Sequence, residues 1–135
     1  QAVAAGHTAV KVKVGDGTAD DDVARAMAVR EAMGPDAALR LDANGAWADA
    51  AAAAPVLARL AAANPIYVEQ PVPPKDLAGL ALLAAGPYKV AADEALGSPA
   101  AADQLLRGGV RMLQFGGDPA ACRRTAGAGF LQQGD

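Results

Sequence analysis

Short apolar segments alternate along the whole chain with longer stretches that have helical periodicity. In the longer stretches, apolar residues recur at about 3.6-residue spacing, whereas each short segment has the length and composition of a single strand. This pattern predicts strands at residues 9–14, 39–42, 66–69, 89–93 and 110–115, and helices at residues 19–33, 49–62, 75–84, 99–107 and 119–126. Strict alternation of this kind predicts right-handed crossovers and a parallel sheet.

Local signals mark the ends of several helices. Three consecutive aspartates at residues 20–22 crowd the first turn of the helix at 19–33, where the helix dipole favours anions, and Gly34 follows its last turn. Pro55 falls inside the segment 49–62. Because proline lacks a backbone N–H, it should kink that helix or mark a later start.

Two architectures share this order of elements, a doubly wound sheet and part of a (β/α)8 barrel. No G-x-G-x-x-G motif follows the first strand, which leaves a dinucleotide-binding fold with little support. A complete barrel needs about 250 residues, and the chain has 135. We therefore expect an α/β fold, a partial (β/α)8 TIM-type barrel with about five βα units. A doubly wound ligand-binding module is the alternative.

Three carboxylates recur at the same point of consecutive units. Asp42, Glu69 and Asp93 each stand at the carboxyl end of a predicted strand, which is the edge where barrel enzymes place their active sites. Neighbouring strands lie about 4.8 Å apart, so side chains from three strands can meet around one ion. Carboxylates without His or Cys favour Mg²⁺ or Mn²⁺ over Zn²⁺. Each acid alone is more typical of a solvated loop residue or a helix N-cap than of a metal ligand, and it is the shared placement on three consecutive strands that favours a site.

A pair of lysines precedes these acids. Lys11 and Lys13 alternate with Val10, Val12 and Val14 on the first strand, so both lysines point to one face and the valines to the other. The valines suit the layer under the helices, and the lysines then face the barrel axis, where neighbouring carboxylates would neutralise them. Alternatively, the lysines form the polar face of an exposed edge strand.

Composition narrows the classes of function. The chain is 53% hydrophobic and 20% charged, enough to bury a core, and its net charge of −3 provides no basic surface for nucleic acid or anionic membranes. The single cysteine, Cys122, excludes an internal disulfide framework and fits a reducing compartment. We interpret Cys122 as a small buried hydrophobe and the single histidine, His7, as a surface or edge residue. We expect a cytoplasmic protein that binds neither nucleic acid nor membrane.

Four short motifs make the chain resemble a known family. They are Lys11-Val12-Lys13, Leu41-Asp42-Ala43-Asn44-Gly45, Val68-Glu69-Gln70-Pro71 and Ala92-Asp93-Glu94. In order and spacing they look like the signature motifs of the enolase superfamily, in its muconate lactonizing enzyme branch. The resemblance runs from about residue 5 to residue 115.

The resemblance implies a chemistry and a set of roles. It makes Lys13 the base that removes a proton α to a carboxylate, with Lys11 assisting it and contacting the substrate. Its metal ligands are Asp42, Glu69 and Asp93, for Mg²⁺ with Mn²⁺ possible, and its substrate is a small carboxylate. By the same resemblance, Asn44 and Glu94 lie next to the metal ligands without binding the metal themselves.

Among the reactions of the family, the resemblance favours syn-dehydration as in o-succinylbenzoate synthase, a lyase of the menaquinone pathway. The stretches at residues 40–47 and 67–71 look most like that group, and one base suffices for its reaction. Muconate-type cycloisomerisation, dipeptide epimerisation, mandelate racemase-like chemistry and sugar-acid dehydration share the same motifs and stay open as alternatives.

One position departs from the family pattern. The family normally carries another lysine on the strand after the third ligand, and Gln114 stands there in this chain. Glutamine can hydrogen-bond a substrate but cannot act as an acid or base. We therefore expect a one-base reaction with Lys13, and the alternatives are sequence drift after about residue 113 or a truncated, non-catalytic remnant.

The expected domain organisation is a single partial barrel over residues 1–135, from which the family's N-terminal capping domain and the remaining barrel strands are absent. Such a piece would expose apolar strand edges. We expect it to be poorly stable and catalytically inactive alone, and its full-length parent to be a homo-oligomer.

Overall fold

The computed structural model describes residues 8–113 of the chain. Strands and helices alternate strictly over this stretch, as the hydrophobic pattern predicts. The strands are β1 (Ala9–Lys13), β2 (Ala38–Asp42), β3 (Tyr67–Glu69), β4 (Val90–Ala92) and β5 (Met112–Leu113), and the helices are α1 (Ala19–Met33), α2 (Ala50–Leu60), α3 (Leu77–Ala85) and α4 (Pro99–Arg107), with a short 3-10 helix, η1 (Ala61–Ala63), after α2.

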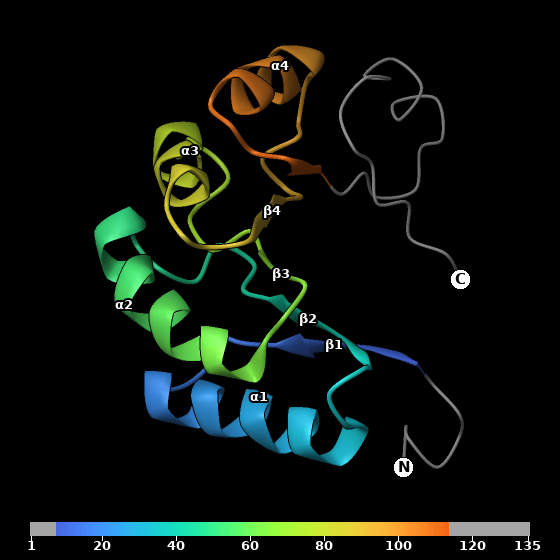
Figure 1. The fold of residues 1–135 in the computed structure, drawn as a ribbon. Helices are drawn as coiled ribbons and strands as arrows, with labels where there is room; N and C mark the ends of the chain where they lie inside the picture. Colours follow the sequence, from blue (N-terminus) through green and yellow to red (C-terminus); the bar gives the residue numbers. More distant parts are fainter. Residues whose placement is uncertain (1–7, 114–135) are drawn as a thin grey trace.

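All five strands are parallel, and their order across the sheet is their order along the chain. Right-handed crossovers that always step in the same direction put every helix on one face of the sheet. Helices α1 to α4 accordingly form one outer layer, with the strands on their inner side (Figure 1). A doubly wound sheet requires a reversal of strand order and helices on both faces. The partial barrel is therefore confirmed, and the doubly wound alternative is wrong.

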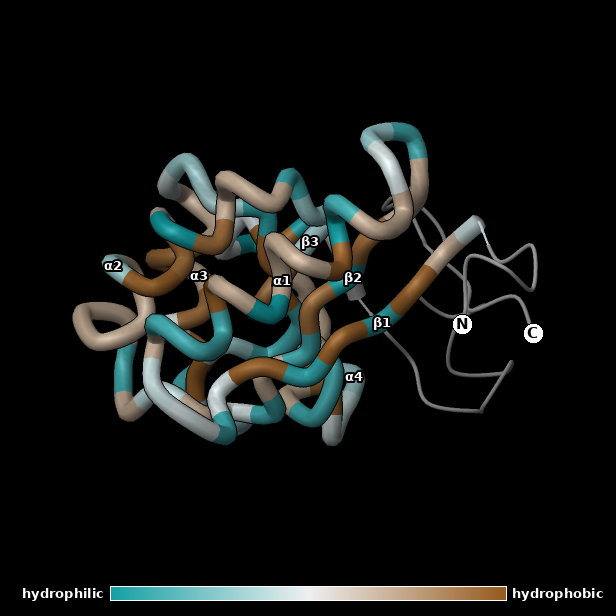
Figure 2. Tube along the Cα trace, turned by 90° about the horizontal axis from the view of Figure 1, so that it is seen from below, coloured by the Kyte–Doolittle hydropathy of each residue, from teal (hydrophilic) through white to brown (hydrophobic). Residues whose placement is uncertain are grey.

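The core fills the space between the sheet and the helix layer. Leu39 and Leu41 of β2 are fully buried there, and Val12 and Val14 join the same apolar cluster. Colouring by hydropathy shows apolar and polar positions alternating along β1 (Figure 2). The valines thus pack under the helices as expected, and Lys11 and its neighbours project from the other face of the sheet.

Side-chain caps fix where the helices begin. Thr18 and Asp21 form a reciprocal capping box at the start of α1. Asp49, Asp76 and Ser98 cap α2, α3 and α4, each accepting a hydrogen bond from a backbone N–H three residues later. Each cap satisfies an N–H that the helix itself leaves without a partner.

Helix α2 begins at Ala50, so the prediction of a later start at Pro55 is wrong. The Asp49 cap accepts from the Ala52 N–H at 2.9 Å and anchors the first turn. Ala53 and Leu57 are buried against the core. Cap and burial together offset the hydrogen bond that proline cannot donate.

The other boundaries differ from the predicted ones by a few residues. The segment 49–62 divides into α2 and η1, the segment 75–84 becomes Leu77–Ala85, and the strand at 89–93 shortens to Val90–Ala92. The predicted helix at 119–126 and the residues His7, Gln114 and Cys122 lie outside the described residues. Within residues 8–113, every helix is too short or too polar to cross a membrane.

Candidate active site

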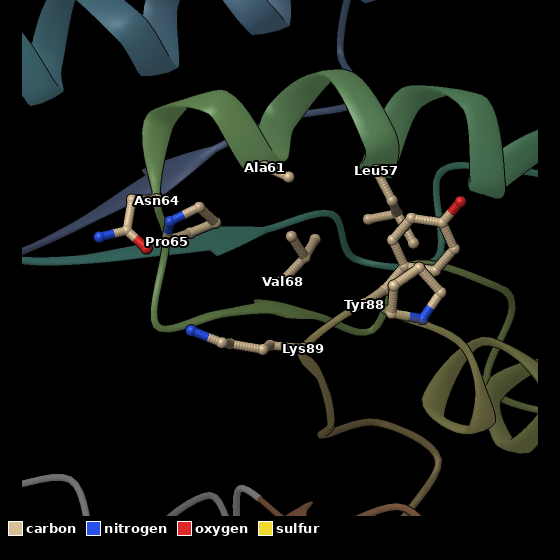
Figure 3. A pocket seen from close by; sticks show the side chains of 8 residues that line it. Leu57, Ala61, Asn64, Pro65, Val68, Tyr88 and Lys89 are labelled. Atoms are coloured by element: carbon tan, nitrogen blue, oxygen red, sulfur yellow. The ribbon is translucent and has the colours of Figure 1, made fainter.

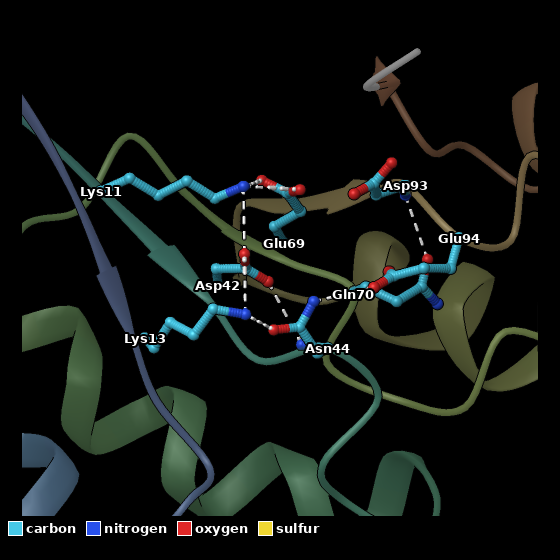
Figure 4. Close-up of polar contacts among 8 residues, drawn as sticks. All are labelled: Lys11, Lys13, Asp42, Asn44, Glu69, Gln70, Asp93 and Glu94. Carbon is cyan, nitrogen blue, oxygen red and sulfur yellow. Dashed lines mark hydrogen bonds and ion pairs between the residues drawn. The ribbon is translucent and has the colours of Figure 1, made fainter. Parts of the chain in front are cut away.

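The predicted site residues meet at the carboxyl edge of the sheet. Lys13 of β1 is in register with Asp42 of β2, and Asp42 is in register with Glu69 of β3. Side chains in register on neighbouring parallel strands point to the same face. Asp93 follows the last residue of β4, so its carboxylate joins the row from the next strand (Figure 4).

Lys11 joins two of the carboxylates. Its Nζ lies 3.0 Å from Oδ2 of Asp42 and 2.9 Å from Oε2 of Glu69. Burial alone would lower the pKa of the Lys11 ammonium, but the hydrogen bonds and charges of Glu69 and Asp42 outweigh it and raise that pKa above its ordinary value. Lys11 therefore carries its proton at neutral pH, which makes it a fixed positive charge between two carboxylates.

Asp93 and Glu69 are two neighbouring carboxylates at this edge, and both are at least partly buried. Glu69 is fully buried. Burial comes first among the causes that raise the pKa of Asp93 to about 7, followed by a hydrogen bond with Glu69 and the charges of Glu69 and Glu94. The carboxyl edge thus holds more carboxylate charge than its lysines neutralise.

Lys13 has a different environment from Lys11. Its side chain is 65% exposed, its Nζ donates a hydrogen bond to Oδ1 of Asn44, and Asp42 is 3.9 Å away. Asn44 in turn donates from Nδ2 to Oε1 of Glu94 at 2.8 Å. Figure 4 shows this chain of contacts from Lys13 to Glu94. Lys13 is therefore held by a neutral amide and by a longer contact with Asp42, and its side chain is largely open to solvent.

Two residues before Lys13, Asp42 and Glu69 on their strands, the same face of the sheet carries three more polar side chains. Lys11 is in register with Arg40, and Arg40 with Tyr67. Burial raises the pKa of the Tyr67 hydroxyl, with the charge of Arg40 opposing that rise, so the phenol is neutral at physiological pH. Arg40 and Tyr67 thus lie on the same face of the sheet as the carboxylates, two residues nearer its amino edge.

Sequence reasoning missed one residue of the site, Gln70. Its side chain is fully buried. The amide oxygen Oε1 accepts hydrogen bonds from the backbone N–H groups of Asp93 at 3.0 Å and Ala95 at 3.1 Å, and Nε2 donates to the Val72 carbonyl at 2.9 Å. The available signal was a polar amide in an apolar segment, placed directly between a strand-end acid and Pro71.

The donor set suits a hard divalent cation, because carboxylate oxygens are the ligands that Mg²⁺ prefers. Burial and the neighbouring carboxylates, which together raise the pKa of Asp93, disfavour its negative charge, and a bound cation would offset both. Within residues 8–113, however, no three carboxylate, imidazole or thiol side chains are arranged as a metal site. The Lys11 ammonium takes the central place between Asp42 and Glu69. The three ligands therefore stay a prediction.

Among the described residues, two cavities lie away from this cluster. One of about 190 Å³ is lined by Leu57 of α2, Val68 of β3 and Tyr88, with Asn64 and Lys89 at its polar end (Figure 3). Asn64 and Lys89 precede β3 and β4, which places the cavity toward the amino edge of the sheet. Active sites of barrel enzymes lie at the opposite edge, so we do not assign this cavity to catalysis.

Fold and site together define a barrel with an acidic, lysine-bearing carboxyl edge, and the comparisons with known proteins agree with it. Residues 1–117 match the family described as Enolase C-terminal domain-like. The chain belongs to that family, and the resemblance stated from its motifs is confirmed.

Three relatives illustrate the range of the family. The hydrophobic dipeptide epimerase of Enterococcus faecalis is 48% identical over 75 residues, which is 56% of this chain. Muconate cycloisomerase 1-2 of Acinetobacter lwoffii is 35% identical over 102 residues, or 73% of this chain. The o-succinylbenzoate synthase structure from Thermosynechococcus elongatus BP-1, which has magnesium in its active site, superposes with a TM-score of 0.82 at 32% identity over 98% of this chain.

The match covers only part of each relative. The chain spans 21% of the epimerase, 26% of the cycloisomerase and 45% of the synthase structure. These relatives are enzymes with different reactions, so the family is shown and the particular reaction is not.

Proposed function

We propose that this chain supplies the metal-binding and base-bearing side of a Mg²⁺-dependent active site that removes a proton α to a carboxylate. The observation that carries the proposal is the cluster at the carboxyl edge. Lys11 pairs there with Asp42 and Glu69, Lys13 lies beside Asp42, and Asp93 of the next unit contacts Glu69.

The two lysines take separate roles in the proposal. Lys11 is held between two carboxylates and stays charged, so it attracts the substrate carboxylate and stabilises negative charge. Lys13 contacts the neutral Asn44 amide and is largely exposed at the same edge. In its neutral amine form it would accept a proton from the substrate carbon and then return it.

Asp42, Glu69 and Asp93 would hold the cation. A divalent cation bound there supplies positive charge against the dianion that forms when the α-proton leaves. Mn²⁺ shares the same ligand preferences and is the expected substitute.

For the reaction itself, we propose syn-dehydration as in o-succinylbenzoate synthase. Lys13 takes the α-proton, the electron pair of that C–H bond forms the C=C bond, and the C–O bond to the leaving hydroxyl breaks. Lys13 then returns the proton, so that water leaves from the same face. One base suffices, and the similarity to the synthase structure from Thermosynechococcus elongatus BP-1 supports this choice. Epimerisation and cycloisomerisation are the alternative reactions, because an epimerase and a cycloisomerase are among the relatives.

The proposal extends to the substrate, the location and the oligomeric state of the protein. The substrate is a small carboxylate, the protein acts in the cytoplasm without nucleic acid or membrane, and the full-length parent is a homo-oligomer. The motifs support the carboxylate substrate, and the net charge of −3 supports the absence of nucleic-acid and membrane partners.

A cation titration of the 135-residue chain tests the proposal. Thermal unfolding should shift upward with Mg²⁺, because a ligand at a hundred times its Kd stabilises the folded state by about 2.7 kcal/mol. Asp42→Asn should abolish the shift. The matched control is Asp103→Asn, which alters an exposed aspartate paired with Arg107 on α4 and should keep the shift. No Mg²⁺ response in the unaltered chain would contradict the proposal and favour the non-catalytic remnant.

A further inference from the structure

Gln70 links the segments of β2, β3 and β4 next to which the carboxylates of the candidate site lie. It follows Glu69 directly, at the end of β3. Its backbone N–H donates to the Ala91 carbonyl at 2.8 Å, and its own carbonyl accepts from the Gly45 N–H at 2.6 Å. Gly45 lies in the loop after Asp42, and Ala91 is the central residue of β4. The backbone of one residue thus joins the exits of three neighbouring strands.

The side chain adds the contacts that fix the loop after β4. Oε1 accepts from the N–H groups of Asp93 and Ala95, and Nε2 donates to the Val72 carbonyl. All three partners are backbone groups, and the Gln70 side chain is fully buried. A buried amide whose oxygen and nitrogen both have partners holds those partners rigidly, because breaking the contacts would strand polar groups away from water.

The backbone conformation of Gln70 requires such support. Its φ is +41°, in the left-handed region, which costs a non-glycine residue free energy. A turn of this kind persists when surrounding contacts determine it. The hydrogen bonds from both the main chain and the side chain of Gln70 supply those contacts.

We propose that Gln70 is a positioning residue, which holds Asp93 at the distance from Glu69 and Asp42 that cation binding requires. This inference rests on the proposed function, because it assumes that the three carboxylates bind the cation. Gln70 does not touch the cation or the substrate in this account. It acts through the backbone of Asp93, the one predicted ligand that lies beyond the end of its strand.

Mn²⁺ binding to the 135-residue chain, followed by electron paramagnetic resonance, tests the inference. Gln70→Met keeps the side-chain length and removes all three side-chain hydrogen bonds. It should weaken Mn²⁺ binding by about 10–100-fold, the range for residues that orient metal ligands. The spectrum of the bound ion should change as well. The matched control is Gln104→Met on the exposed face of α4, which should leave affinity and spectrum unchanged.

A double-mutant cycle separates positioning from general destabilisation. Asp93→Asn removes the third carboxylate charge. If Gln70 acts through Asp93, adding Gln70→Met to Asp93→Asn should weaken Mn²⁺ binding no further. A full additional loss in the double variant would overturn the inference. Leu80→Ala, at a fully buried position of α3, lowers stability at a distance from the carboxylates and should leave the affinity unchanged.

Amide exchange provides a second measurement. The N–H groups of Asp93 and Ala95 should exchange faster in Gln70→Met, whereas the Val68 N–H, bonded to the Lys89 carbonyl at 2.8 Å, should stay protected. If Gln70→Met fails to fold, Gln70→Asn replaces it, because its shorter amide cannot span the same partners. Unchanged Mn²⁺ affinity in a folded variant overturns the inference and leaves the proposed function standing. Absence of Mn²⁺ and Mg²⁺ binding by the unaltered chain overturns both.

Discussion

At the amino edge of the sheet, Arg30 donates hydrogen bonds to the backbone carbonyls of five residues. At the carboxyl edge, two lysines pair with two carboxylates, and a third carboxylate, Asp93, lies beside them. The five carbonyls belong to Gly34, Pro35, Ala37, Ala63 and Asn64. They tie the end of α1 to the loops that lead into β2 and β3. The partners of the Arg30 guanidinium are neutral carbonyls, so these contacts carry no surplus of negative charge.

The carboxyl edge has the opposite character. Lys11 neutralises part of the charge of Asp42 and Glu69. Burial, with the nearby carboxylates Glu69 and Glu94, still raises the pKa of Asp93 to about 7. A charge paired with backbone carbonyls stabilises a fold. A surplus of buried carboxylates costs stability unless a cation is bound, which is why perturbed groups of this kind gather at functional sites.

The largest effect is expected for Lys11→Met. Removing the ammonium leaves Asp42 and Glu69 buried together without their shared partner, which should cost about 3 kcal/mol of unfolding free energy, the lower end for a buried pair because Lys11 is one-third exposed. Added Mg²⁺ should recover part of the loss and give a larger upward shift than in the unaltered chain. Urea denaturation with and without Mg²⁺ measures both quantities.

The matched control for Lys11→Met is Lys13→Met on the same strand. Lys13 is 65% exposed and 3.9 Å from Asp42, so its replacement should cost below about 1 kcal/mol. Equal losses in the two variants would remove the distinction between the two lysines.

A smaller effect is expected at the amino edge. Arg30→Met strands several carbonyl oxygens and should lower the unfolding free energy by about 2 kcal/mol. It should leave the response to Mg²⁺ unchanged, because Arg30 lies at the far edge of the sheet. Arg59→Met provides the control, since Arg59 forms an exposed ion pair with Asp20 that is worth below about 1 kcal/mol. A changed Mg²⁺ response in Arg30→Met would mean that the two edges are coupled.

The smallest effect is expected away from both edges, at the cap of α1. Thr18→Ala removes a hydroxyl that accepts from the Asp21 N–H at 3.2 Å and donates to the Asp21 carboxylate at 2.7 Å, which should cost about 1 kcal/mol. The hydrogen bond from Thr18 is also the main reason that the pKa of Asp21 lies below 3.8.

The lowered pKa of Asp21 predicts a sign for the pH dependence. A carboxyl group whose pKa is lower in the folded state stabilises the fold above its unfolded pKa and loses that contribution as the pH falls through the folded pKa. Stability below about pH 4 should therefore fall less steeply in Thr18→Ala. Denaturation curves across this range measure the slope, with Thr8→Ala as an exposed control, and identical slopes in both variants would contradict the prediction.

Much of the fold could be predicted from the sequence because the signals are local. Valines alternating with lysines identified β1 and both of its faces, and the aspartates at residues 20–22 marked the start of α1. The positions of Asp42, Glu69 and Asp93 at strand ends were also readable, since parallel strands in sequential order bring their carboxyl ends to one edge. The later start predicted from Pro55 was wrong, because the N-terminal cap and the buried residues of α2 outweigh a single missing hydrogen bond.

What the sequence determined by itself is therefore the order of elements, the layer that each side chain faces and the edge at which the acids gather, because strand alternation and helix periodicity are properties of neighbouring residues. Only the tertiary structure decided that Lys11 lies between Asp42 and Glu69, and that Gln70 holds the loop of Asp93. Those contacts join residues from different strands. Their partners depend on strand register and on a left-handed turn, which no local pattern specifies.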